Sequence, residues 1–198
     1  MPRKKGKTML PNPTPQLVRR YIKNFDRENQ EIECTLAELF ALFPKNTENS
    51  QVVVKASAIN ILFQTWISGI TTVANHITNL DIDSAIERGD AEIVDRIARV
   101  KFKEKIRRNY SFATKYCFWH RPNSYPMYDW RVDYCLWEYR VQDPARSFQF
   151  KRTDLRNYDE FRKIVDNFKV CYGLTDFTYR EIDKFLYHLG GEFGGDSA

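Results

Sequence analysis

Apolar side chains recur at three- and four-residue intervals along most of this chain, and this spacing constrains the fold more than any other feature. Such intervals place apolar residues on one face of a helix. The stripe of Leu17, Tyr21 and Phe25 near the start and the pair Ile182 and Leu186 near the end are examples. The pattern predicts an all-α fold, a single helical domain of about nine helices.

Capping residues and glycines divide these periodic stretches into separate helices. Gly89 is typical of the residue just after a helix end, and the only short strand candidate is the segment 147–150. Caps that predict helix starts are Thr14 followed by Pro15, Thr35 with Glu38, and Thr178 with Glu181. We therefore expect a flexible basic arm over 1–13, one helical domain over 14–191 and a flexible tail over 192–198.

The composition is that of a globular protein, with 42% hydrophobic and 29% charged residues. No apolar run approaches the roughly 18 residues of a membrane helix, and no apolar signal segment follows the basic N-terminus. We expect a cytoplasmic protein that contacts no membrane. The cysteines show no CxxC pair, so they are interpreted as buried thiols; they are Cys34, Cys117, Cys135 and Cys171. The sequence indicates no metal and no cofactor.

Most of the positive charge lies at the N-terminus. The net charge is +5, and four of these charges fall within residues 1–12, so the other 186 residues sum to +1. The body holds one dense basic cluster, which could contact phosphates or form an ordinary solvated face. Its members are Arg99, Lys101, Lys103, Lys105, Arg107 and Arg108.

The segment 111–132 carries the most distinctive motif. A helix rich in small residues, Ser-Phe-Ala-Thr-Lys, leads through a turn at Arg121-Pro122 to Tyr-Pro-Met-Tyr-Asp, and a new helix follows. This segment resembles the helix-hairpin-helix DNA glycosylase family. Pro126, Asp129 and Val132 match the proline, aspartate and valine of that family's motif, with one extra residue before the aspartate. The segment 182–186 also resembles the last helix of bacterial proteins that share this pattern.

The resemblance implies a site centred on Asp129. In the family, a fixed carboxylate stabilises the positive charge that develops on the sugar when the base leaves, and aromatic side chains hold the extruded base. Residues proposed here for base stacking are Trp119, Tyr125, Tyr128 and Trp130. Nucleic-acid contacts are proposed for Lys101, Lys103, Lys105, Arg107, Arg108 and Lys115, with DNA as the expected partner and RNA as the alternative.

The segment also departs from the family. The glycine-containing turn that holds a DNA phosphate is replaced by residues 107–111, which contain no glycine. The nucleophilic lysine of bifunctional members, about 18 residues before the aspartate, is replaced by residues 109–111, so we expect no lyase activity. Lys115 lies further along and is interpreted as a partner of Asp129 or Asp133. His120 is interpreted as a surface residue at a helix end.

Two readings of function remain open. In the first, the protein binds nucleic acid and excises a base with Asp129 as a monofunctional glycosylase. In the second, Asp129 only caps a helix, the aromatic residues belong to the core, and the domain is a non-enzymatic module that binds DNA or protein, for example in bacterial host defence. The sequence leaves the oligomeric state open.

Overall fold

The computed structural model describes residues 9–142 and 148–194, and within these ranges the fold is all-α, as predicted. The helices and strands are α1 (Pro15–Leu42), α2 (Asn49–Leu62), α3 (Ile70–Asn79), α4 (Asp83–Arg88), α5 (Glu92–Ala98), β1 (Arg99–Phe102), β2 (Lys105–Arg108), α6 (Tyr110–His120), α7 (Trp130–Gln142), the 3-10 helix η1 (Arg152–Arg156), α8 (Tyr158–Cys171) and α9 (Tyr179–Phe193). In the described residues, no helix is long and apolar enough to cross a membrane.

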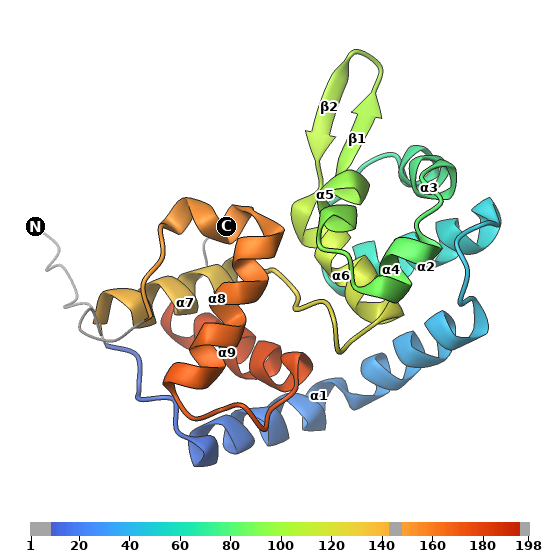
Figure 1. The fold of residues 1–198 in the computed structure, drawn as a ribbon. Coiled ribbons are helices and arrows are strands. Elements are labelled where there is room, and N and C mark those ends of the chain that lie inside the picture. Colours follow the sequence, from blue (N-terminus) through green and yellow to red (C-terminus); the bar gives the residue numbers. More distant parts are fainter. Residues whose placement is uncertain (1–8, 143–147, 195–198) are drawn as a thin grey trace, which may run out of the picture.

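Two groups of helices lie side by side and share α1 (Figure 1). Helices α2 to α6 and the β-hairpin form one group, and α7, α8 and α9 form the other, while α1 runs along both. The ring of Tyr21 packs edge-on against Phe185 of α9, and the ring of Phe40 packs edge-on against Tyr116 of α6. The buried apolar side chains of both groups form one continuous core. Because α1 contributes to both ends of this core, it fixes how the groups sit together.

Most predicted helix boundaries are confirmed. Thr14 caps α1 with Pro15 behind it, and Gly89 ends α4 in the left-handed conformation. Thr178 and Glu181 form both bonds of the capping box at α9.

The predicted helix start at Thr35 is wrong. The Thr35 hydroxyl donates to the carbonyl of Glu31 at 2.9 Å within α1 instead of capping a new helix. Leu36 and Phe40 are buried on the same face as Tyr21. The buried stripe therefore continues through the capping motif, and one 28-residue helix forms.

The predicted flexible arm and the predicted flexible tail both include residues that pack against the domain. Leu10 is buried, and the carbonyl of Pro11 accepts the hydroxyl of Tyr139 at 2.8 Å. At the other end α9 continues to Phe193, and Glu192 accepts the hydroxyl of Tyr21 at 2.6 Å. The remaining parts of the predicted arm and tail, 1–8 and 195–198, lie outside the described residues.

The basic cluster forms a β-hairpin that the sequence reading missed. Antiparallel pairing joins Arg99 to Arg108 and Phe102 to Lys105. Lys103 turns the chain with a φ of +52°, a conformation usually taken by glycine. The segment 148–150 has no strand conformation, and residue 147 of that strand candidate lies outside the described residues.

The cysteines differ in exposure. Cys117 and Cys135 are buried thiols, as predicted, whereas Cys171 is half-buried and Cys34 is exposed on α1. The expectation of buried thiols is therefore wrong for Cys34 and holds only in part for Cys171.

Candidate functional site

Three polar side chains on one face of α6 hold the segment that leads into α7. Ser111, Thr114 and Lys115 are three and four residues apart, so they share that face. The Thr114 hydroxyl accepts the backbone N–H of Tyr128 at 3.0 Å, and the Ser111 hydroxyl donates to the Tyr128 carbonyl at 3.2 Å. These bonds fix the backbone directly before Asp129.

Lys115 and Asp129 form a nearly buried ion pair. The Lys115 ammonium donates to Oδ2 of Asp129 at 3.2 Å, to the Ser111 hydroxyl at 2.7 Å and to the Tyr128 carbonyl at 2.9 Å. The Lys115 side chain is 3% exposed and that of Asp129 is 13% exposed. The other carboxylate oxygen, Oδ1, accepts the N–H of Arg131 at 3.1 Å. Asp129 is thus both the cap of α7 and the counter-ion of Lys115.

A cavity of about 70 Å³ lies beside this ion pair, where α1, α2, α6 and α9 meet. Phe25 and Phe63 line its apolar side, while Asp129 and Asp183 line its polar side. The Phe63 ring lies 5.8 Å from the Lys115 nitrogen. At roughly 30 Å³ per water molecule, the cavity holds about two waters and is smaller than a nucleobase. A base therefore fits only when side chains that line the cavity, such as Phe63, move aside.

Asp183 is a second carboxyl group on this cavity, and the sequence reading did not place it in the site. Burial raises the pKa of Asp183 to about 6, and the charges of Asp129 and Glu33 act in the same direction, whereas Arg180 and Lys115 lower it. Arg180 of α9 bridges Asp183 and Glu33 of α1. The cavity therefore contains one carboxylate paired with a lysine and another carboxyl whose pKa is raised by burial.

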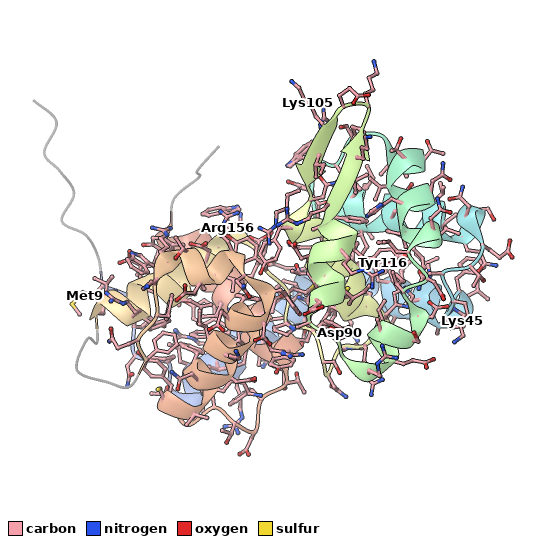
Figure 2. The ribbon with its side chains drawn as sticks, turned by 45° about the horizontal axis from the view of Figure 1, so that its top comes forward. Met9, Lys45, Asp90, Lys105, Tyr116 and Arg156 are labelled. Atoms are coloured by element: carbon pink, nitrogen blue, oxygen red, sulfur yellow. The ribbon has the colours of Figure 1, made fainter. Side chains whose placement is uncertain are left out.

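The hairpin displays three of the residues proposed to bind nucleic acid. Lys101, Lys103 and Lys105 are exposed, and no ion pair joins them to another residue in the described part of the chain. Figure 2 shows Lys105 at the outer end of the hairpin, away from the body. Arg107 donates instead to the hydroxyl of Ser68 in the loop after α2.

Arg108 and Lys115, also proposed to bind nucleic acid, both form ion pairs within the protein. Arg108 pairs with Asp95 at 2.8 Å, donates to the carbonyl of Arg156 and stacks on the ring of Tyr110. It therefore joins the base of the hairpin to η1. Lys115 lines the Asp129 cavity and is only 3% exposed, so it does not belong to the basic surface. Its charge is compensated by Asp129. The proposed phosphate contact by Lys115 is thus incompatible with this structure.

The proposed base-stacking residues are mostly part of the core. Tyr125 is fully buried and stacked on Tyr158, and Tyr128 is 3% exposed. Trp119 is 9% exposed, and Trp130 is 38% exposed at the start of α7. Tyr125 and Tyr128 thus cannot hold a base in this structure, because their ring faces are covered by other rings.

Comparison with known proteins identifies a family without giving an activity. The HI_0787_N family, described as an N-terminal domain, matches residues 17–124, more than half of the chain. A protein of Haemophilus influenzae, named "Uncharacterized protein", is 36% identical over 134 residues, which are 67% of this chain. The aligned part is 63% of that relative's length, so the chain spans less than two thirds of it. No solved structure matches the chain.

Proposed function

The chain belongs to the HI_0787_N family, and we propose that it binds nucleic acid and excises a base as a monofunctional glycosylase centred on Asp129. The family match ends at residue 124, so it includes Lys115 but not Asp129. The proposal therefore rests on the site itself and on the resemblance of Pro126, Asp129 and Val132 to the glycosylase motif.

The observation that carries the proposal is a fixed carboxylate at the edge of a cavity between the two groups of helices. Cleavage of an N-glycosidic bond develops positive charge on the sugar, and a carboxylate held in advance stabilises that charge without reorganisation. The α6 face and the start of α7 hold Asp129 in this way. The Lys115 ammonium holds the carboxylate in place, with only 13% of the Asp129 side chain exposed.

The surroundings of Lys115 favour a monofunctional reaction. Its nitrogen donates to three oxygen acceptors, and a nitrogen that donates three hydrogen bonds has no lone pair directed at the sugar. Lys115 therefore serves as a positioning residue for Asp129, and water is the nucleophile. Base release should then leave an intact abasic strand.

The test compares three proteins in an assay for base release. A panel of damaged and modified duplexes and single strands is incubated with wild type, Asp129→Asn and Asp129→Glu, and abasic sites are detected by alkaline cleavage. Loss of the carboxylate in Asp129→Asn should lower the rate on the order of a hundredfold or more. Asp129→Glu keeps the charge but displaces it, so a partial loss is expected. Borohydride should trap no covalent complex.

Stability must be measured beside activity, because Asp129→Asn leaves Lys115 without its counter-ion. Removing one partner of a buried pair costs about 3–5 kcal/mol, and Asp129→Glu avoids this cost. Asp90→Asn is a matched control, because Asp90 accepts the N–H of Glu92 at 2.9 Å at the start of α5 and lies away from the cavity. A folded wild type that releases no base from any substrate would contradict the enzymatic proposal.

A second candidate is the non-enzymatic module, and one observation favours it. Both carboxylate oxygens of Asp129 are already engaged, one with the N–H of Arg131 and one with Lys115. These two bonds alone would explain an aspartate at this position. Nucleic-acid binding that is unchanged in Asp129→Asn, together with no base release by wild type, would support the module.

A further inference from the structure

The loop between α2 and α3 holds the most exposed aromatic side chain among the described residues. Trp66 is 83% exposed, and its backbone has a φ of +55°. Gln64, two residues earlier, also has a positive φ of +48°. Such conformations cost bulky residues on the order of 1–3 kcal/mol each. Folding alone would favour glycine or asparagine at position 66.

Neighbouring residues hold the loop in this strained form. The Asn60 side chain accepts the N–H of Ile67 at 2.9 Å and donates to its carbonyl at 3.2 Å. It also accepts the hydroxyl of Thr65 at 3.0 Å. Ile67 is buried, so the chain is anchored on both sides of Trp66. Hydrogen bonds on both sides of Trp66 therefore hold the loop in the conformation that exposes the indole to solvent.

The same loop lies against the basic hairpin. Arg107 donates to the Ser68 hydroxyl, and a Cβ on Gly69 would come within 2.7 Å of the Phe102 ring. An open hollow of about 670 Å³ begins at Ser68 and extends to the hairpin, where Lys103, Lys105 and Arg107 outnumber the one acidic residue, Glu104. The hollow therefore begins two residues after the exposed Trp66 and ends at two lysines that form no ion pair within the described residues.

On the other side, the loop adjoins the Asp129 cavity. Phe63, three residues before Trp66, lines that cavity and lies near Lys115. Trp66 is therefore three residues along the chain from a side chain that lines the cavity beside the carboxylate.

We infer that Trp66 and the hairpin lysines form a docking surface for an unpaired nucleic-acid strand, with a base stacked on Trp66 and phosphates on Lys103 and Lys105. Proteins bind single strands with aromatic side chains next to cations. The aromatic ring stacks on the face of a base, and the cations contact the negatively charged phosphates. The lysines make an acidic backbone the complementary occupant. The inference rests on the nucleic-acid-binding part of the proposed function.

The test separates base stacking from phosphate contact with two fluorescent oligonucleotides. One is a twelve-residue oligothymidylate, and the other has the same backbone with every base replaced by an abasic spacer. Fluorescence anisotropy gives the dissociation constants for wild type, Trp66→Ala and Trp66→Phe. Trp66→Ala should weaken binding of the oligothymidylate about tenfold or more and leave the abasic backbone unaffected. Trp66→Phe should retain most of the affinity.

The controls keep the outcomes distinct. Leu42→Ala removes another exposed apolar side chain, 70% exposed at the far end of α1, and should change neither affinity. Trp66→Ala should fold normally, because the side chain is exposed, and circular dichroism checks this. Equal binding of the oligothymidylate by wild type and Trp66→Ala would overturn the inference alone. Absence of any binding by wild type would overturn it together with the proposed function, whereas a Trp66 effect without base release would leave the inference standing.

Discussion

At the end of α6, His120 is half-buried and bonded within a polar cluster, instead of lying free on the surface as predicted. Its Nε2 lies 3.1 Å from the side-chain oxygen of Asn46, which also accepts the Tyr116 hydroxyl at 2.6 Å and the Lys55 ammonium at 2.8 Å. Burial, followed by the nearby charge of Lys55, lowers the pKa of His120 to about 3. The folded protein therefore keeps His120 neutral at pH values where the unfolded chain protonates it.

This shift predicts acid sensitivity. Between the ordinary pKa of 6.5 and about 3, only the unfolded state takes up the proton, so His120 lowers stability as pH falls through that window. The contribution reaches about 1.4 kcal/mol per pH unit. Urea unfolding at several pH values should show a shallower decline for His120→Gln than for wild type. His76→Gln, on α3 outside this cluster, should follow wild type, and an unchanged slope in His120→Gln would contradict the assignment.

Between elements, α7 and α9 approach each other closely at Gly190. A Cβ added to Gly190 of α9 would lie 2.6 Å from Cβ and 2.7 Å from the carbonyl oxygen of Arg131. The backbone of α7 cannot retreat without displacing Asp129, which bonds the N–H of Arg131. The glycine therefore determines how near α9 and its Asp183 come to the Asp129 cavity.

We expect Gly190→Ala to destabilise the protein by about 1–3 kcal/mol, the usual cost of overpacking. Gly191→Ala is the matched control, because its Cβ would meet only the flexible guanidinium of Arg131 at 3.3 Å. That variant should be neutral or gain up to about 1 kcal/mol from helix propensity. Denaturant unfolding of both variants measures the difference. Equal stabilities would show that the two helices are free to separate.

The elements also show which parts of the fold are readable from sequence. Helical stripes and caps such as Thr178 act locally, so they predicted most helices and the loop before Asp129. The helix start predicted at Thr35 was wrong because the buried face of α1 continues on both sides of this capping motif. The hairpin was missed because its turn contains Lys103 and Glu104, with no glycine or asparagine to signal a positive φ.

Across the whole molecule, the cavity is assembled from elements far apart in the chain. Arg180 of α9 reaches Glu33 of α1 across 147 positions, and Lys115 reaches Asp129 across 14. The Lys115–Asp129 pair could be predicted from the sequence, because only a short loop separates the helix of Lys115 from Asp129. The roles of Asp183 and Phe63 could not be predicted, because their partners depend on how α1 brings the two groups of helices together.

The placement of charge over the whole molecule leads to the last prediction. The hairpin carries Lys101, Lys103 and Lys105 on one projecting element, whereas four other cations lie within residues 1–7, outside the described part of the chain. Because Lys103 and Lys105 line the hollow that begins at Ser68 and Lys101 lies on the same hairpin, the three lysines should contact phosphates of a bound strand at fixed positions. Each contact contributes about 0.9 to the slope of log affinity against log salt for duplex DNA, and about 0.7 for a single strand.

Replacing the three hairpin lysines with alanine should therefore reduce the magnitude of that slope by about 2 to 3. Deleting residues 1–7 should have the smaller effect on affinity at low salt. Substitution of Lys23, Lys151 and Lys163, which are exposed on α1, before η1 and on α8, removes the same charge elsewhere and controls for net charge. Anisotropy titrations over a series of salt concentrations measure all four proteins. If the control triple variant lowers the slope as much as the hairpin triple variant, then general charge attraction and not a hairpin site accounts for binding.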